Sequence, residues 1–308
     1  MASHPNLVHL DDVPEEVRDL GPLRARRRRA GRAAGAAGVG LSLFEMGPGE
    51  RGVPVHVHAD EEELFYVVAG SGVSWQDGRT YAIATGDLVC HLAMREAHTM
   101  VAGPDGLRVL AFGEGSRTNI SHLPRARAWW LGPGWLPEGP ESPLQREAAA
   151  GPLELPDAPE AGRPPSIVAT EDHPPEVFDR PGYEGEERDL ARAAGSIRSG
   201  LRHTVLRPGA LSCPPHWHTA EEELFVVLAG SGEALLGDDV LDLRAGHVLC
   251  RPPGTGVAHA LRAGPEGMTY LAYGTRVPGD LVHYPRSGKI KLGGLFVRVE
   301  PVDYWDGE

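Results

Sequence analysis

The chain has 308 residues, with 43 acidic and 30 basic side chains that give a formal net charge of −13 at pH 7. At about 100–200 residues per domain, this length predicts two domains. The acidic balance argues against a nucleic-acid partner, and the lack of any apolar run of about 18 residues argues against a membrane partner. We expect a cytoplasmic protein, because residues 1–20 do not resemble a signal peptide and the three cysteines are odd in number and scattered.

The sequence repeats itself after a shift of about 160 residues. The strongest match joins residues 54–72, PVHVHADEEELFYVVAGSG, to residues 214–232, PPHWHTAEEELFVVLAGSG. The chain is therefore predicted to contain two copies of one unit, as domains at 6–132 and 166–308. The residues between them, 133–165, include nine prolines. This composition predicts a semi-rigid Pro-rich linker, which three tryptophans at its start could pack against the domains.

The expected elements, taken in chain order, are mostly strands. Weak helical patterns occur at 15–20, 143–150 and 186–194, and the arginine-rich run 24–29 is expected to be a solvated loop. Predicted strands lie at 64–69, 81–86, 87–91 and 107–112, and again at 224–229, 241–243, 248–250 and 268–273. Gly-Ser-Gly turns are expected to end the strands at 64–69 and 224–229. The 40 glycines and 28 prolines also favour an all-β class with many turns.

Three histidines and a glutamate recur in each copy. His56 and His58 are separated by one residue of a strand-like segment, so both side chains are expected on one face. Glu63 begins the next apolar strand, and His98 follows a further strand and turn. The second copy repeats the pattern as His216, His218, Glu223 and His259. Imidazole and carboxylate ligands suit Fe, Mn, Ni, Cu or Zn, so we expect one divalent transition metal in each domain.

This spacing resembles the first motif of the cupin superfamily, in which His-x-His is followed by Glu and then, after six residues, by Gly. Here the glycines are Gly70 and Gly230. The family's second motif is matched in the second copy by Gly246, Pro252, Gly254 and His259, whereas Leu92 and Met94 replace its Pro and Gly in the first. The chain is identified as a member of the bicupins. The resemblance implies two tandem jelly-roll barrels, each with a metal inside.

The candidate glutamates belong to triplets at 61–63 and 221–223. The resemblance selects Glu63 and Glu223 as the ligands, and Glu62 and Glu222 are the alternatives. Two further pairs of equivalent residues are expected to contact the ligands or the substrate, with packing or ion pairing as the alternative: His91 with Arg251, and His122 with His283. Of these, Arg251 suits a substrate carboxylate.

Five other residues have structural expectations. Cys90 and Cys250 are expected to fill buried apolar positions, with a redox or metal role as the alternative. Trp217 lies between two ligands, and alternation along a strand turns it away from the metal. Tyr304 and Trp305 are expected to dock on a barrel, the other domain or a partner subunit.

The reaction is not fixed by the resemblance, because cupins include dioxygenases, decarboxylases, isomerases, sugar binders and storage proteins. Retention of all four ligands in both copies favours a metal-dependent enzyme of the dioxygenase or decarboxylase type, acting on a small organic substrate. The main alternative is a non-catalytic small-molecule-binding or structural metal protein. A sugar isomerase or epimerase is a weaker alternative, and the resemblance further suggests a homodimer.

Overall fold

The computed structural model describes residues 4–115, 118, 120–132, 134–137 and 139–308, in which nearly all regular structure is β-strand. The strands of the first half are β1 (Leu7–His9), β2 (Glu15–Leu20), β3 (Leu23–Arg28), β4 (Val39–Met46), β5 (Val57–His58), β6 (Glu63–Gln76), β7 (Arg79–Ala84), β8 (Asp87–His91), β9 (His98–Glu114), β10 (Ile120–Leu123), β11 (Ala128–Leu131) and β12 (Gly134–Leu136). Those of the second half are β13 (Ile167–Ala169), β14 (Glu176–Arg180), β15 (Tyr183–Asp189), β16 (Ser199–Leu206), β17 (Trp217–His218), β18 (Glu223–Leu236), β19 (Asp239–Arg244), β20 (His247–Arg251), β21 (His259–Thr275), β22 (Leu281–Tyr284), β23 (Lys289–Leu292) and β24 (Leu295–Arg298). The helices are α1 (Ala30–Ala33), α2 (Pro143–Ala149) and α3 (Leu190–Ala193), with one 3₁₀ turn, η1 (Leu10–Asp12).

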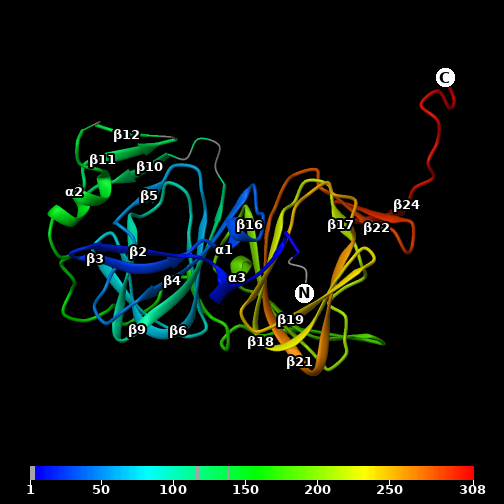
Figure 1. Cartoon of the computed structure of the whole chain (residues 1–308), viewed down its shortest axis with the longest axis horizontal. Coiled ribbons are helices and arrows are strands. Elements are labelled where there is room, and N and C mark those ends of the chain that lie inside the picture. The colour runs from blue at the N-terminus through cyan, green and yellow to red at the C-terminus, as the bar shows by residue number, and fades with distance from the viewer. Residues whose placement is uncertain (1–3, 116–117, 119, 133, 138) are drawn as a thin grey trace.

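Each half forms a barrel from one eight-stranded and one four-stranded sheet, and the two barrels lie side by side (Figure 1). In the first half the large sheet runs β13-β8-β6-β9-β4-β3-β2, with β7 as its eighth strand paired to β6, and the small sheet runs β12-β11-β10-β5. In the second half the orders are β1-β20-β18-β21-β16-β15-β14, with β19 as the eighth strand paired to β18, and β17-β22-β23-β24. The expected all-β fold of two tandem barrels is confirmed.

The halves exchange their first strands. Strand β1 pairs with β20 of the second half, so that Leu7 lies opposite Leu249, and β13 pairs with β8 of the first half, so that Ile167 lies opposite Val89. Each predicted unit therefore supplies an edge strand to the sheet of the other. The start of the described chain, drawn in dark blue, accordingly lies against the second barrel in Figure 1.

Alternation along the central strands separates two kinds of apolar core. In β6, Phe65 and Val67 belong to the interior of the first barrel, whereas Leu64 and Tyr66 belong to a cluster shared by both halves. That shared cluster also contains Cys90 and Cys250, which are buried as expected. Burial of this apolar surface at the interface stabilises the contact between the two barrels.

The glycines after residues 64–69 do not end the strand, and this expectation was wrong. Strand β6 continues through Gly70 to Gln76, with register shifts against β9 on both sides of Gly70. A Cβ at Gly70 would lie 2.2 Å from the carbonyl oxygen of Gly106, and Gly70 has a φ of 84°. These glycines therefore allow close approach of β9 at a bulge. The same change of register occurs in β18.

The expectations for residues 15–20 and 24–29 were also wrong. Both segments are strands, β2 and β3, which form a hairpin. Acidic side chains of β2 face arginines of β3 and of the residue after it. Arg28 Nη2 of β3 lies 2.8 Å from Glu15 Oε2, and Arg29 Nε, directly after β3, lies 2.7 Å from Glu16 Oε1. These cross-strand ion pairs stabilise the extended backbone. They cannot be seen from the arginine run alone, because the acidic partners lie on another strand.

The other two segments that were expected to be helical do contain helices. Helix α2 lies where residues 143–150 predicted it and begins with a capping box between Ser142 and Gln145. Residues 186–194 are a strand end, in β15, followed by the short helix α3. Among the described residues no helix is long and apolar enough to span a membrane.

The segment 133–165 lies against the first barrel over much of its length. In α2, the fully buried Glu147 accepts hydrogen bonds from Arg51 Nη1 (2.7 Å) and Arg125 Nη1 (3.0 Å). Arg163 donates to Asp87 at the start of β8. By contrast, Tyr304 and Trp305 at the C-terminus are 85% and 71% exposed and contact each other edge to face.

Candidate metal centres

The first cluster forms where strands β5, β6 and β9 meet. His56 is bridged to His98 through the backbone, His58 ends β5, and Glu63 begins β6. The carboxylate oxygen Oε2 of Glu63 lies 3.1 Å from Nε2 of His56, 3.3 Å from Nε2 of His58 and 3.0 Å from Nε2 of His98. The four predicted ligands of the first copy therefore converge, each with one atom directed at a common point.

Hydrogen bonds at Nδ1 fix the three imidazoles in this orientation. Nδ1 of His56 lies 2.9 Å from the carbonyl oxygen of Pro54, and Nδ1 of His98 lies 3.1 Å from that of Glu96. Nδ1 of His58 lies 3.0 Å from Oγ of Ser121. A carbonyl oxygen only accepts, so the Nδ1 atoms of His56 and His98 carry the proton and their Nε2 atoms are free to bind a metal.

The second cluster has the same framework. Nε2 of His259 lies 2.9 Å from Oε2 of Glu223, Nε2 of His218 lies 3.6 Å from it, and the ligand atoms of His216, His218 and Glu223 lie within 4.8 Å of one another. Oε2 of Glu223 and Nε2 of His259 are buried, and within the described residues neither has a hydrogen-bond partner. Buried polar atoms without partners are costly, and a cation between them would satisfy both, so the residues fit a metal.

Burial sets the charge of these groups. Together with the neighbouring His91 and His56, burial lowers the pKa of His98 to about 3, and burial with His259 lowers that of His216 to about 4. Both imidazoles are neutral at pH 7, which is the form that binds metals. Burial opposes ionisation of Glu223, but the surrounding histidines outweigh it and lower its pKa to about 2.

His58 has the opposite shift. Burial lowers its pKa, but the carboxylates of Glu63 and Glu61 outweigh burial and raise the pKa of His58 to about 9. In turn, His58 and His56 hold the pKa of Glu63 well below its usual range, although burial raises it. A cation bound at the first cluster would therefore compete with a proton on His58.

The alternative glutamates point away from both clusters. Glu62 accepts hydrogen bonds from Oγ of Ser196 (2.7 Å) and from the backbone N–H groups of Ile197 (3.0 Å) and Arg198 (3.1 Å) of the second half. Glu222 accepts from the backbone N–H groups of Ala37 and Gly38 of the first half, at 2.9 and 2.6 Å. Both are buried in the interface between the barrels, which leaves Glu63 and Glu223 beside the histidines.

His91 and Arg251 occupy equivalent positions behind the third histidines. The ring of His91 stacks on that of His98, with centroids 3.7 Å apart, and its Nδ1 lies 2.8 Å from Oε1 of Glu96. Arg251 is 5% exposed, donates to the carbonyl oxygen of Val257, and leaves its Nε without a hydrogen-bond partner in the described chain. Arg251 lies among residues that surround Glu223 and His259.

His122 and His283 lie on the outer side of their strands. His122 stacks on Trp129, with ring centroids 4.4 Å apart, and His283 stacks on Trp217, with centroids 4.2 Å apart. Because Trp217 faces His283, it points away from the flanking ligands His216 and His218. The two histidines and Trp217 therefore pack the small sheets.

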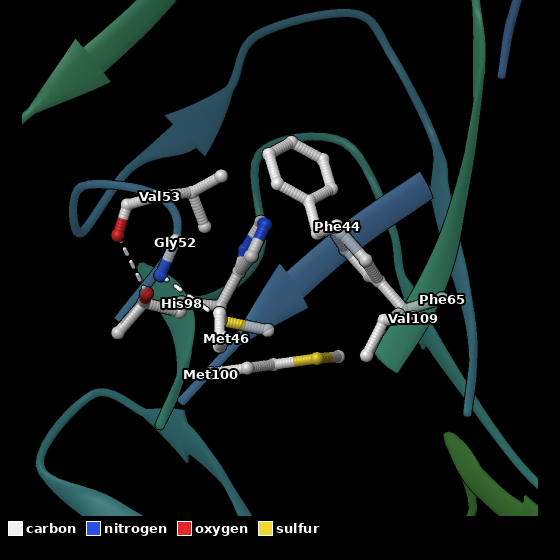
Figure 2. Close-up of a pocket in the computed structure, with 9 residues that line it drawn as sticks. Phe44, Met46, Gly52, Val53, Phe65, His98, Met100 and Val109 are labelled. Carbon is white, nitrogen blue, oxygen red and sulfur yellow. Dashed lines mark hydrogen bonds between the residues drawn. The ribbon is translucent and has the colours of Figure 1, made fainter. Parts of the chain in front are cut away.

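The interiors of the two barrels differ sharply in free space. The first encloses a cavity of only about 10 Å³ beneath His98, close to the lower limit for one water molecule. Figure 2 shows His98 among apolar side chains that fill this space; they include Phe44, Met46, Met100 and Val109. The cavity beneath His98 therefore has no room for an organic substrate.

The second barrel contains a cavity of about 320 Å³. The four candidate ligands His216, His218, Glu223 and His259 line it. Other polar residues of its wall include Glu187, Arg202, Ser212, Cys213, Glu221, Tyr270, Tyr273, Thr275, Arg276, Tyr284 and Lys291. Where Phe44 fills the first barrel, the equivalent residue of the second is the smaller Thr204, which donates to Glu187.

The sequence did not indicate the partner of His218. Nδ1 of His218 lies 2.6 Å from Oδ2 of Asp280, a residue that precedes β22. Burial opposes the charge, but hydrogen bonds from His218 and from the backbone N–H groups of Ala220 and Glu221 hold the pKa of Asp280 below its ordinary value. Asp280 lies far from His218 in the sequence, and only the pairing of β22 with β17 brings the two together.

The fold and the clusters define a duplicated β-barrel protein whose halves each carry a three-histidine, one-glutamate site suited to a metal. A family model described as "Cupin domain" matches the sequence twice, at residues 42–110 and 202–272. The chain therefore belongs to the bicupins, as the motifs predicted. No curated protein sequence matches it.

Solved structures of oxalate decarboxylase share this fold. The structure of oxalate decarboxylase from Bacillus subtilis at pH 4.6 is 16% identical, with 89% of this chain and 76% of that chain covered and a TM-score of 0.61. A structure describing the substrate binding mode and a reaction specificity switch in oxalate decarboxylase is 17% identical, covers 89% and 77% of the two chains and has a TM-score of 0.61. Identities this low establish a common fold alone.

Proposed function

We propose that this bicupin is a metal-dependent enzyme of the decarboxylase type, which acts on a small carboxylic acid in its second barrel. The observation that carries the proposal is the cavity of about 320 Å³ lined by His216, His218, Glu223 and His259. This volume falls in the range of about 300–1,000 Å³ that small-molecule sites occupy. The likeness in fold to oxalate decarboxylases supports this type of reaction.

Two arginines of the cavity wall support a carboxylate substrate. Arg202 and Arg276 line the cavity and are held by Glu187 (3.0 Å) and Asp189 (3.6 Å), and the exposed Lys291 lies at its edge. Guanidinium groups bind carboxylates in a bidentate geometry, so the two arginines are suited to orient the acid. The half-buried Tyr284 of the small sheet lies beside His216, with ring centroids 5.6 Å apart, and covers one side of the ligands.

The chain also supplies a proton donor. A metal held by the four ligands would act as a Lewis acid that stabilises negative charge on the substrate. Glu221 lines the same cavity, and burial raises its pKa above the ordinary value. Loss of CO₂ leaves a carbanion that must take up a proton, and a carboxyl group with a raised pKa is suited to donate it.

We assign the first cluster a structural role within this proposal. Its four ligands converge as well as those of the second, but the adjoining cavity has room for about one water molecule. The non-catalytic alternative thus applies to the first barrel, and the enzyme hypothesis to the second. We further propose a cytoplasmic homodimer without a nucleic-acid partner; the free thiols Cys90, Cys213 and Cys250 support a reducing compartment.

The test combines metal analysis with product detection. Protein purified without added metal is analysed for metal atoms per chain, then assayed for CO₂ release and O₂ uptake with a panel of mono- and dicarboxylic acids. We expect two metal atoms per chain and CO₂ release without O₂ uptake. The variant H216A/H218A should lose one metal atom and all turnover, whereas the matched variant H56A/H58A should lose one metal atom and retain turnover.

Other outcomes would contradict the proposal. Stoichiometric O₂ uptake would favour the dioxygenase type, and lack of turnover by fully metal-loaded protein across the panel would favour a non-catalytic binding protein. Loss of turnover in H56A/H58A, with the fold intact by circular dichroism, would place the reaction in the first barrel.

A further inference from the structure

Asp280 is held rigidly against the second cluster. Its Oδ2 lies 2.6 Å from Nδ1 of His218, while its Oδ1 accepts hydrogen bonds from the backbone N–H groups of Ala220 (2.7 Å) and Glu221 (3.2 Å). Oγ1 of Thr219 donates to the same Oδ1 at 3.2 Å. The side chain is 6% exposed, so water does not compete for these contacts. Both carboxylate oxygens are committed, and one of them faces only the imidazole.

In the first barrel the nearest partner of His58 Nδ1 is a neutral group, the hydroxyl of Ser121, 3.0 Å away. The carboxylates of Glu61 and Glu221 lie at similar distances in the two barrels, 3.4 Å from Nδ1 of His58 and 3.6 Å from Nδ1 of His218, so the barrels differ in Ser121 against Asp280. Ser121 pairs with His58 across β5 and β10, and Val282 takes the equivalent place opposite His218. The side chain of valine cannot accept a hydrogen bond, so in the second barrel Asp280 accepts the hydrogen bond from Nδ1 of His218. The residue of the first half that aligns with Asp280 is Asn119, which lies outside the described residues.

A carboxylate changes the imidazole more than a hydroxyl does. It accepts the proton of Nδ1, which fixes the tautomer with a lone pair on Nε2, and its charge makes Nε2 a stronger donor. A hydroxyl can donate as well as accept, so it neither imposes this tautomer nor adds charge. Loss of such a carboxylate typically weakens metal binding about 10–100-fold.

We propose that Asp280 is a positioning residue which acts through His218 and makes the second metal centre electronically different from the first. The inference rests on the proposed function, because it requires a metal at His216, His218, Glu223 and His259. It predicts a stronger imidazole ligand, tighter binding and a distinct ligand field in the second barrel. The two centres of one chain would then take the same metal with different affinities.

The test isolates the second centre in the full chain. In the H56A/H58A background, Zn²⁺ affinity is measured by competition with a chromogenic chelator, and the visible absorption of bound Co²⁺ is recorded. Adding D280N should weaken Zn²⁺ binding by about 10–100-fold and shift the Co²⁺ bands. Asparagine retains an oxygen for Ala220 and Glu221, so the substitution removes the charge while keeping the loop contacts.

Matched variants of the first centre serve as controls. In the H216A/H218A background, S121A should weaken Zn²⁺ binding less than D280N does, and S121D should tighten it by placing a carboxylate near His58. Thermal unfolding of each metal-free variant shows whether the fold is retained, and D280S provides a second substitution if D280N unfolds.

The outcomes separate this inference from the proposed function. If H56A/H58A binds Zn²⁺ at the second centre and folded D280N matches it in affinity and Co²⁺ spectrum, the role of Asp280 is overturned and the proposed function stands. If H56A/H58A binds no Zn²⁺ at all, both are overturned. Weaker binding by D280N with an unchanged Co²⁺ spectrum would also overturn the electronic effect, because a purely structural role predicts that result.

Discussion

Glu62 and Glu222 occupy equivalent positions in the two halves, and each carboxylate accepts backbone N–H groups from a loop of the opposite half. Each is followed directly by the glutamate that faces the histidines. Successive side chains of a strand point to opposite faces, so one residue joins the barrels while the next enters the metal cluster. In each glutamate triplet, adjacent residues therefore connect the interface between the barrels to a candidate metal centre.

Substitution of Glu62 should affect stability and leave metal content unchanged. In E62A the hydroxyl of Ser196 and the N–H groups of Ile197 and Arg198 lose their buried acceptor, so the free energy of unfolding should fall by about 3 kcal/mol. Urea unfolding and metal analysis measure the two effects, with the exposed Glu171 as a control in E171A. Loss of one metal atom per chain in folded E62A would instead make Glu62 the ligand.

The unequal cavities predict opposite effects of the same substitution in the two barrels. Ala111 and Ala272 are equivalent and half-buried, but Ala272 lines the large cavity, whereas Ala111 packs against the filled apolar core of the first barrel. A111F should overpack that core and lower the free energy of unfolding by about 1–3 kcal/mol. A272F should fold normally, keep its metal and lower kcat/KM by about 100-fold, because it occupies substrate space. Equal losses of stability in the two variants would show that the cavity of the second barrel is not open.

The buried thiols should resist alkylation in the folded protein. Burial raises the pKa of Cys90 to about 12, and the partial burial of Cys213 raises its pKa to about 12 as well. A thiol with a raised pKa stays protonated at pH 8, so the reactive thiolate is scarce. The thiolate becomes abundant only as the pH approaches 12. Iodoacetamide with mass spectrometry should detect little modification of the native chain at pH 8 and full modification in guanidinium. Rapid native alkylation of Cys90 would favour the redox role over the apolar one.

The helix of segment 133–165 should be as important to the first barrel as its strands. Glu147 is fully buried between Arg51 and Arg125, and its removal in E147A leaves buried guanidinium charge uncompensated. A loss of about 3–5 kcal/mol in the free energy of unfolding is expected. The exposed Glu154 gives a matched control in E154A. If E147A changes neither urea unfolding nor proteolysis of this segment, the segment is a passive connector.

Local patterns in the sequence predicted the barrels, and they selected eight candidate ligands that the structure brings together in two clusters. The His-x-His spacing places two imidazoles on one face, and the duplication indicated two sites. What escaped prediction depends on contacts between distant residues. Asp280 reaches His218 only through the pairing of β22 with β17, and Glu62 finds its donors only in the other half.

Two local expectations failed for the same physical reason. The arginines of β3 form a strand because Glu15 and Glu16 lie across from them in β2. Strand β6 continues through Gly70 because β9 approaches too closely for a side chain there. In both cases contacts with the neighbouring strand determine the backbone conformation. The sequence of one segment does not show which strand will lie beside it.

The reciprocal pairing of β1 with β20 and of β13 with β8 makes each half incomplete by itself. A half expressed alone would carry one strand with no sheet to join and one sheet with a vacant edge. Those two features are complementary, because the halves are copies, so two molecules of a single half can satisfy each other across a twofold axis. Joining the two copies in one chain makes this exchange of strands intramolecular, so its completion does not depend on the concentration of the protein.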